Sequence, residues 1–348
     1  MYQMLNQSNF IKLLIILAAI GFLFVAQNNF NDYTIRILNT IAIFIILATS
    51  YNLINGVTGQ FSLEPNGFVA IGAYVTAIAL LSEDAKWETF QLEDPHPWVL
   101  ALSLDLIPAL LMSGLAATIV AVFLAAPVFR VRGDYLAIVT LGFGFIIKVI
   151  AINNPEFTNG SIGLNDIPSV INLYWTGGIA IITTVLILNI VYSKYGRAMK
   201  AVRDDEDAAS AIGINTFKIK TYAFGTSAFF EGVGGGLLAI LLSTISPDLF
   251  TFFLTFQLLI IIVLGGLGSM TGAIVGTIVV IGGMEWLRFL DSPLSLFGID
   301  FGAHPGLRMV VFSLILIIVM LFAREGIMGK RELFDFFKKK KKTTKDKK

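Results

Sequence analysis

The chain alternates long apolar runs with short polar stretches over nearly its whole length. A helix needs roughly 20 residues to cross the hydrocarbon core of a bilayer, which is ~30 Å thick. By this measure the apolar runs predict ten spans, near 11–27, 35–54, 67–82, 98–129, 135–152, 174–193, 221–243, 251–265, 269–289 and 307–323. The pattern therefore predicts an all-α, polytopic integral membrane protein with about ten transmembrane helices.

Two of these regions leave alternatives open. The 98–129 run is longer than one crossing requires. Either its helix tilts, or its first turns, around Asp105 and Pro108, lie outside the hydrocarbon core. The stretch Gly265-Gly-Leu-Gly-Ser269 interrupts the 251–289 region and leaves a short first piece. That piece is either a complete short span or a half-membrane, re-entrant helix.

Basic residues in the connections predict the orientation. They gather in the loop 194–220, in the turn 130–134 and in the tail 331–348, whereas the connection 83–97 is acidic. Ten crossings place every basic connection and both termini in the cytoplasm, with the protein in the inner (plasma) membrane. We expect a single transmembrane domain, 1–330, with an uncleaved first helix, a cytoplasmic coupling loop at 194–220 and a basic cytoplasmic tail at 331–348.

Composition supports this class and excludes several others. Hydrophobic residues make up 56% of the 348, the mean hydropathy is +0.79, and charged residues make up 14%, against about 25% in soluble chains. The chain has no cysteine, which excludes disulfides and thiolate chemistry. Its two histidines, His96 and His304, have no ligand cluster near them in the sequence. We expect no metal, no cofactor and no catalytic site.

The polar segment 195–213 differs from the other connections. It is rich in helix-forming residues and mixed in charge, and apolar spans flank it on both sides. It must therefore lie in water between two spans. An ordered polar helix pair on one face of a membrane protein suggests a surface for a partner.

Two glycine-rich breaks interrupt the apolar sequence. Asn55 to Gly67 holds three glycines and one proline, and Leu53 to Gln60 resembles Val263 to Met270. Broken helices at membrane depth need protein or a watery cavity to satisfy their backbone groups, and transporters often place substrate sites there, in corresponding positions of two halves. The two stretches indicate either an inverted repeat or two ordinary turns.

Acidic residues inside apolar sequence are the second indication of a pathway, because a buried carboxylate is costly. Asp105 and Glu285 lie near span ends, where an interfacial position explains them. Glu64 lies in the broken segment, and Glu231 lies deep in the seventh span. The candidate pathway set is therefore Gln60, Ser62, Glu64, Asn66 and Glu231. For the two glutamates, helix–helix hydrogen bonds are the alternative.

Four stretches of the chain form distinctive motifs. The most specific is Phe129-Arg-Val-Arg-Gly-Asp-Tyr-Leu-Ala-Ile-Val-Thr-Leu-Gly-Phe-Gly144. The others are Asn55-Gly-Val-Thr-Gly-Gln-Phe-Ser-Leu63 with Ala70-Ile-Gly-Ala-Tyr74, Gly196-Arg-Ala-Met-Lys-Ala-Val-Arg203, and Ile262-Val-Leu-Gly-Gly-Leu-Gly-Ser269. Together these stretches resemble the M-type (LivM-like) permeases of branched-chain amino-acid ABC importers, and the resemblance extends over most of the chain, from about residue 40 to 325.

The resemblance implies one half of a heterodimeric channel. Its partners would be a sister permease, two cytoplasmic ABC ATPase subunits and a periplasmic substrate-binding protein. In such permeases a cytoplasmic Glu-Ala-Ala-x-x-x-Gly loop docks the ATPase, and Asp207-Ala208-Ala209-Ser-Ala-Ile-Gly213 is similar. We expect Ala208 and Ala209 to enter a cleft on the ATPase, Gly213 to end the helix in a left-handed conformation, and Arg203 to pair with Asp207.

Three departures from the family pattern fall in the suspected pathway. Leu63-Glu-Pro-Asn66 stands where the family commonly has Leu-Gly-His-Ala, Phe145 stands where it has Glu, and Glu231 stands where it has a small residue. The resemblance implies a permease that imports branched-chain or other hydrophobic amino acids, driven by ATP hydrolysed on other chains. The alternatives are the same architecture with urea or a short amide, or an ion-coupled secondary transporter using Glu64 and Glu231.

Overall fold

The structure is a computed structural model that describes residues 2–131, 133, 135–291, 294–296, 299–301, 306–323, 325–329 and 332. Its long helices are α1 (Tyr2–Asn29), α2 (Asp32–Asn52), α3 (Pro65–Leu80), α6 (Leu106–Val128), α7 (Tyr135–Ile152), α9 (Leu173–Tyr192), α12 (Thr216–Leu242), α13 (Phe252–Gly265) and α16 (Leu307–Phe322). The shorter helices are α4 (Glu83–Thr89), α5 (Pro97–Ala101), α8 (Pro155–Thr158), α10 (Lys194–Asp204), α11 (Glu206–Ala211), α14 (Met270–Thr277) and α15 (Gly283–Trp286).

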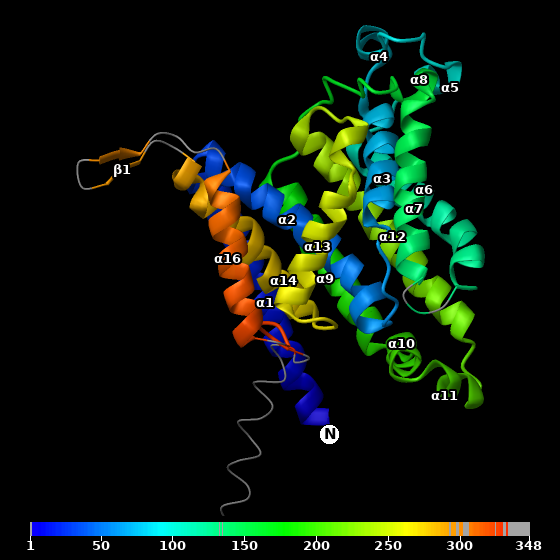
Figure 1. Cartoon of the computed structure of the whole chain (residues 1–348), viewed down its shortest axis with the longest axis vertical. Coiled ribbons are helices and arrows are strands. Elements are labelled where there is room, and N and C mark those ends of the chain that lie inside the picture. Colours follow the sequence, from blue (N-terminus) through cyan, green and yellow to red (C-terminus); the bar gives the residue numbers. More distant parts are fainter. Residues whose placement is uncertain are drawn as a thin grey trace, which may run out of the picture.

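Irregular turns and one small hairpin complete the fold. The π-helical turns η1 (Leu53–Val57) and η3 (Ile278–Gly282) continue α2 and α14, and the 3-10 turns are η2 (Pro247–Leu249) and η4 (Leu287–Asp291). Strands β1 (Leu294–Leu296) and β2 (Ile299–Phe301) pair antiparallel, with Leu294 opposite Phe301. This hairpin projects from the side of an otherwise helical bundle (Figure 1).

Seven helices in the described part of the chain are long and apolar enough to cross a membrane. They run over Asp32–Val57, Leu106–Val128, Tyr135–Ile152, Leu173–Tyr192, Thr216–Leu242, Pro247–Gly265 and Met270–Asp291. Three shorter apolar helices, Ile16–Asn29, Pro65–Leu80 and Leu307–Val319, fall on the other predicted spans. The all-α, multi-pass architecture is confirmed. The count of ten crossings stays a prediction, because α3 and α16 are shorter than these seven helices and the side chains of α1 are described only from Ile16 onward.

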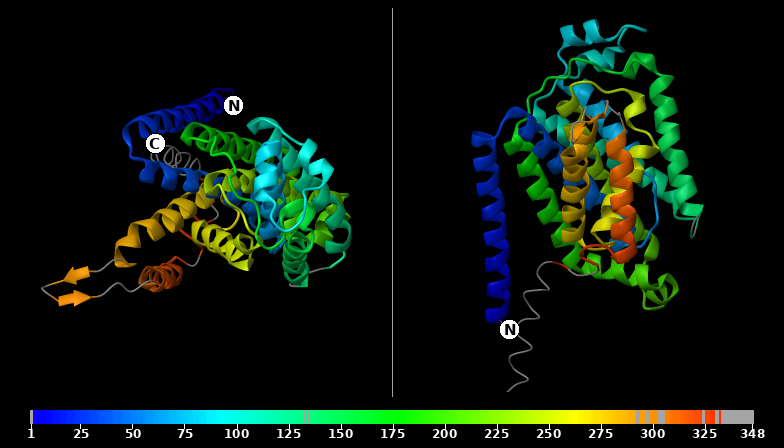
Figure 2. Two further views of the ribbon diagram at one scale, coloured as in Figure 1. Left: turned by 90° about the horizontal axis from the view of Figure 1, so that it is seen from above. Right: turned by 60° about the vertical axis from the view of Figure 1, so that its left-hand side comes forward.

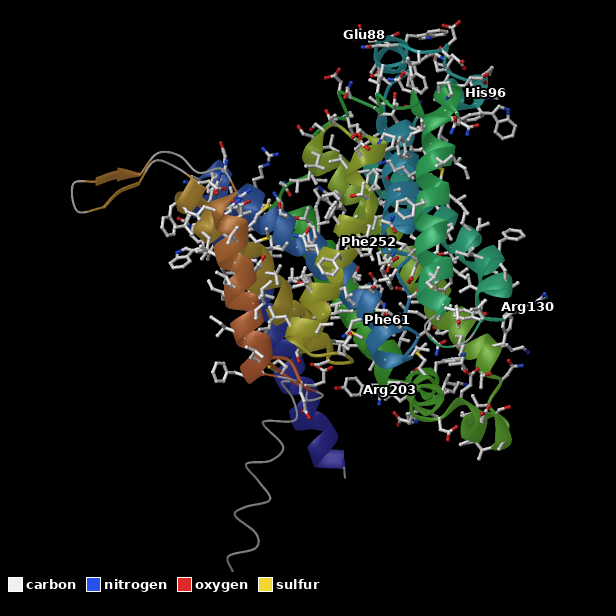
Figure 3. All side chains as sticks on the ribbon, viewed as in Figure 1. Phe61, Glu88, His96, Arg130, Arg203 and Phe252 are labelled. Atoms are coloured by element: carbon white, nitrogen blue, oxygen red, sulfur yellow. The ribbon has the colours of Figure 1, made fainter. Side chains whose placement is uncertain are left out.

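The two ends of the bundle carry different elements (Figures 1 and 2). The acidic helix α4 lies at one end with α5 and α8, and the basic helix α10 lies at the other end with α11 and the start of α1. Figure 3 shows the same separation, with Glu88 at the upper end and Arg130 and Arg203 toward the lower end. The basic and acidic connections thus lie at opposite ends. Which end faces the cytoplasm stays a prediction.

The positions at which helices break bear on the open alternatives for two spans. The chain leaves helical geometry between Ala101 and Leu106, so α5 is a separate short helix and the long crossing begins at α6. In the 251–289 region, α13 together with η2 and α14 together with η3, α15 and η4 each meet the length and apolarity of a full span. This favours a complete crossing over a re-entrant helix.

A buried lysine fixes the upper end of the bundle. Lys86 in α4 is fully buried, and its ammonium donates to the carbonyl of Val99 at 2.7 Å and to the carbonyl of Leu102. The positive charge meets carbonyls at the C-terminal end of α5, where helix geometry favours a cation. Burial lowers the pKa of Lys86, and the nearby Glu83 partly offsets this shift.

Helices α3, α6 and α12 pack around glycines at the centre of the bundle. A Cβ on Gly72 of α3 would collide with the backbone carbonyl of Gly232 in α12, and a Cβ on Gly232 would lie 2.7 Å from the carbonyl of Ser113 in α6. The Ser113 hydroxyl also donates to the Gly232 carbonyl at 3.3 Å. Small residues thus let three backbones approach closely, which is a common way to associate helices in membranes.

Replacing Gly72 by alanine tests this packing. We expect Gly72→Ala to lower the free energy of unfolding by about 2 kcal/mol, because an added methyl forces a packed backbone apart. Gly142→Ala is the matched control, since a Cβ on Gly142 of α7 would meet no atom within 4 Å. Thermal unfolding in detergent measures both variants. Equal melting temperatures for the two would contradict the close α3–α12 contact.

Candidate functional site

Four of the five predicted pathway residues lie where α2 ends and α3 begins, and the fifth, Glu231, lies in α12. Glu64 is the residue before α3, Pro65 is the first residue of that helix, and Glu64, Ser62 and Asn66 are at most 1% exposed. Gln60 is half-buried, and its backbone N–H donates to the carbonyl of Ile54 at 3.1 Å. Proline suits the first turn of a helix because its missing N–H has no partner there in any case.

Side chains from neighbouring elements satisfy the broken backbone around Ser62. The hydroxyl of Tyr51 donates to the Ser62 carbonyl at 2.7 Å, and the Ser62 N–H donates to Asn55 Oδ1 at 3.0 Å. The next N–H, of Leu63, donates to Thr140 Oγ1 at 2.8 Å. The segment therefore avoids the cost of unpaired backbone groups at membrane depth. The sequence contained these partners, but nothing in it indicated the pairing.

Asn66 joins α3 to the start of α13. Its backbone N–H donates to Thr255 Oγ1 at 3.1 Å, and the Thr255 hydroxyl lies 3.2 Å from Asn66 Oδ1. Asn66 Nδ2 donates to the carbonyl of Phe250 at 3.4 Å. A Cβ on Gly144 of α7 would collide with the Asn66 amide. Asn66 thus has partners on two sides, which makes it a structural link as well as a pathway candidate.

Glu231 is buried in the middle of α12, and Ser227 is its one hydrogen-bonding partner among the described residues. The Ser227 hydroxyl lies 3.0 Å from Glu231 Oε1 and 2.7 Å from the carbonyl of Ser50 in α2. The other carboxyl oxygen, Oε2, is buried without a hydrogen-bond partner. The alternative of a helix–helix hydrogen bond therefore accounts for only part of this side chain.

Glu64 has no donor at all among the described residues. Both of its carboxyl oxygens and the Ser62 hydroxyl are buried without a partner. Glu231 lies near enough to Glu64 for two ionised carboxylates to repel each other. An ionised carboxylate without donors in such surroundings costs several kcal/mol. Binding of a cationic group or of a proton would therefore lower the free energy of this site relative to two ionised, unpaired carboxylates.

The other charged candidates have ordinary partners. Lys148 forms an ion pair with Asp248 at 2.7 Å and does not offset the buried acids. Asp105 is exposed at the start of α6. Glu285 accepts a hydrogen bond from the Tyr33 hydroxyl at 3.0 Å and lies 3.7 Å from Arg288. The interfacial interpretation of Asp105 and Glu285 fits these positions.

The polar segment 195–213 folds into two helices at the lower end of the bundle. α10 ends at Asp204, and Asp205 has extended backbone angles (φ −161°, ψ 111°) before α11 begins. The Asp205 carboxylate then accepts from the N–H of Ala208 at 2.9 Å, as an N-cap residue does. An ion pair of 2.6 Å between Lys220 and Glu206 attaches α11 to α12.

Gly213 ends α11 as predicted. Its φ is +86°, a value that glycine adopts readily and other residues rarely do. The N–H of Ile214 donates to the carbonyl of Ala209 at 3.1 Å, and the N–H of Gly213 donates to the carbonyl of Ser210 at 3.0 Å. These two bonds form a Schellman motif, which satisfies the last carbonyls of a helix.

Two details of the predicted docking loop are wrong. Arg203 does not pair with Asp207; it pairs with Asp204 at 2.9 Å, because the break at Asp205 removes the helical spacing between them. Ala209 is 2% exposed and packs inside the chain, so it cannot enter a cleft on a partner. Ala208 and Asp207 are exposed. Ile212, which sequence analysis missed, is 76% exposed beside them.

The two glycine-rich breaks meet at the lower end. Asn52 Nδ2 donates to the Ser269 carbonyl at 2.9 Å, and the Gly268 N–H donates to Asn52 Oδ1 at 2.9 Å. Gly56 packs directly against the Gly268 backbone. Each break follows a helix, α2 or α13, that runs toward this same end (Figure 1). Inverted copies would run in opposite directions, so this pair of segments does not mark an inverted repeat.

A carboxylate near the C-terminus closes the same junction. Glu332 accepts hydrogen bonds from the N–H groups of Met270 and Thr271, at 2.7 and 3.0 Å, at the start of α14. A negative charge is favourable at a helix N-terminus. Apart from Glu332, the predicted basic tail 331–348 lies outside the described residues, as do Arg132 and Asp134 of the signature stretch and His304.

The apolar helices, with a polar helix pair at one end of the bundle, define a multi-pass membrane protein. A family model described as the permease component of branched-chain amino acid transport systems matches residues 33–320. The chain belongs to this family. Its members are transport permeases and not enzymes, and they work with other components of ABC transport systems.

Individual relatives carry the same description. LivM of Escherichia coli, a high-affinity branched-chain amino acid permease, is 30% identical over 85% of this chain and 70% of its own length. LivH of Salmonella typhimurium is 26% identical over 90% of this chain and 98% of its own length. A probable LivM of Methanocaldococcus jannaschii is 25% identical over 50% of this chain and 53% of its own. No solved structure matches the chain.

Removing Ser227, the hydrogen-bonding partner of Glu231, tests the buried network. We expect Ser227→Ala to lower the free energy of unfolding by about 2 kcal/mol, because the Glu231 carboxyl and the Ser50 carbonyl both lose a buried partner. Adding Glu231→Leu to Ser227→Ala should recover part of the loss, since the unpaired acid is then gone. Thermal unfolding of the single and double variants measures this. Additive losses would contradict the proposed dependence of Glu231 on Ser227.

Proposed function

We propose that this chain is one of two membrane-spanning permease subunits of an ABC importer. It moves branched-chain or other hydrophobic amino acids inward, and ATP is hydrolysed on partner chains. Membership in the permease family is the observation that carries this proposal. The permease domain covers residues 1–330, and a basic tail follows at 331–348.

The proposed ATPase contact is the lower surface formed by α10 and α11. Asp207, Ala208, Ile212 and Gly213 are exposed there, although α11 is anchored firmly by its caps and by the Lys220–Glu206 ion pair. A rigid helix that presents small residues and one exposed isoleucine suits a shallow cleft on another protein. Arg203 and the buried Ala209 belong to this element but act from inside the chain.

The remaining partners follow from the two ends of the bundle. The protein spans the inner (plasma) membrane. Its basic lower end and both termini face the cytoplasm. Two ABC ATPases bind below, and an extracellular or periplasmic substrate-binding protein delivers the solute from above. A sister permease completes the channel.

The proposed pathway includes the broken segment before α3 and the facing part of α12. Gln60, Ser62, Glu64, Asn66 and Glu231 are its candidate residues. The buried, unpartnered carboxyl oxygens of Glu64 and Glu231 support this proposal, because the ammonium of an amino acid would supply the missing donors. Helix movements around the broken segments would open the site to each side in turn.

A substitution on the exposed face of α11 tests the ATPase contact. We expect Ile212→Glu to reduce copurification of the ATPase subunits by about tenfold, since a charge placed in a docking surface is costly. Trp98→Glu is the matched control, because Trp98 is 81% exposed on α5 at the opposite end. The measurement is the ATPase-to-permease ratio after affinity purification. Equal ratios for both variants would count against docking at α11, and no ATPase with the wild type would overturn the proposed function.

Neutralising the buried acids tests the pathway. We expect Glu64→Gln and Glu231→Gln each to lower the ratio of leucine uptake to uptake of uncharged amides by about tenfold. The reason is that the ammonium of the amino acid loses its charged partner. Glu285→Gln serves as control, since Glu285 already pairs with Arg288 near a helix end. Transport into proteoliposomes containing the full complex measures the ratio. Unchanged rates and preference in both variants would exclude these acids from the pathway.

A further inference from the structure

Arg203, near the end of α10, reaches out of the polar helix pair and into the broken end of α2. Its Nη1 donates to the carbonyl of Gly56 at 3.3 Å. Gly56 lies in the π-helical turn η1, whose last carbonyls point toward the lower end without a helical continuation. A guanidinium is well placed there, because the C-terminal end of a helix attracts positive charge.

Two further glycines leave room for the arginine side chain. A Cβ on Gly59 (φ +71°) would lie 2.9 Å from Arg203 Cβ, and one on Gly268 (φ +85°) would lie 3.4 Å from Arg203 Nη1. Arg203 thus lies against both glycine-rich breaks, the one after α2 and the one between α13 and α14. Figure 3 shows the residue at the boundary between the bundle and α10.

The two breaks are themselves joined beside Arg203. The buried Asn52 side chain accepts from the N–H of Gly268 and donates to the carbonyl of Ser269. A displacement of α10 would therefore reach the segment before α3 and the α13–α14 turn together. Packed contacts of this kind have few intermediate arrangements, so they transmit movement well.

We propose that Arg203 is the positioning residue that couples ATPase movement to the broken segments of the pathway. This inference rests on the proposed function and adds to it the route by which α10 acts. The carboxylate of Asp204, which accepts from Nε and Nη2 of Arg203, orients the guanidinium so that Nη1 remains for Gly56. Lysine has no such planar fork and would not replace it fully.

The test compares Arg203→Ala and Arg203→Lys with the wild type in the complete transporter, reconstituted in proteoliposomes. We expect both variants to retain bound ATPase and ATP hydrolysis, while substrate uptake per ATP hydrolysed falls by about tenfold for alanine and less for lysine. Arg130→Ala is the matched control, an exposed arginine of the same end that follows α6. An unchanged ratio for Arg203→Ala, or an equal fall for Arg130→Ala, would overturn the inference.

A distance measurement keeps the inference testable even if uptake is lost through poor folding. Because the chain has no cysteine, Arg197→Cys on α10 and Leu267→Cys in the α13–α14 turn place two spin labels uniquely. With Arg203 present, we expect the same label separation in the nucleotide-free and ATP-bound complex. With Arg203→Ala, the separation should differ between the two states.

The outcomes separate this inference from the proposed function. Label separations that respond to ATP equally with and without Arg203 would overturn the coupling role while leaving an ATP-driven importer intact. If the wild-type chain binds no ATPase and its uptake does not need ATP, the proposed function fails and the inference fails with it. Two results together would support the inference and the proposed function. In Arg203→Ala, uptake per ATP hydrolysed is reduced, and the distance between the spin labels depends on nucleotide only in this variant.

Discussion

Backbone groups that leave a helix inside a bilayer must find partners within the protein, because lipid offers none. The chain meets this constraint at the end of α2, where helix gives way to a π-helical turn and then to a segment without regular secondary structure. Tyr51, Asn55 and Thr140 supply the donors and acceptors that the backbone around Ser62 lacks. The position of α3, and with it the candidate pathway, depends on these bonds.

The large features could be predicted because they follow from local rules. The length of each apolar run locates the apolar helices, and the distribution of lysine and arginine distinguishes the two ends of the bundle. Gly213 predicts that α11 ends in a left-handed conformation. Each of these depends on residues close together in the sequence. The break at Asp205 was not predicted, because the residues of the polar segment favour a helix throughout. In the structure Asp205 is the N-cap of a new helix, so Arg203 and Asp207 are not one helical turn apart.

The details of the site could not be predicted because they join distant residues. Asn52 and Ser269 are 217 positions apart, and Ser227 and Ser50 are 177 apart. A similar stretch after each of two helices suggested an inverted repeat, whereas three-dimensional contact shows the two stretches side by side at one end. Burial also depends on residues that are distant in the sequence. Ala208 and Ala209 are neighbours in the sequence, but Ala208 is exposed and Ala209 is buried.

Seven consecutive residues at the end of α2 connect the buried acids to the lower surface. The Ser227 hydroxyl lies 2.7 Å from the Ser50 carbonyl and 3.0 Å from Glu231 Oε1, so it connects the two. Asn52 contacts the α13–α14 turn, and the Gly56 carbonyl accepts from Arg203. A rotation of this short stretch would change the surroundings of Glu231 and the position of the segment that bears Glu64 in one movement. The π-helical turn η1 lies in this stretch, and such turns are frequent at functional sites. The buried Glu231 and the end of α10 are therefore both in contact with one short segment of the chain, Ser50 to Gly56, Glu231 through Ser227 and α10 through Arg203.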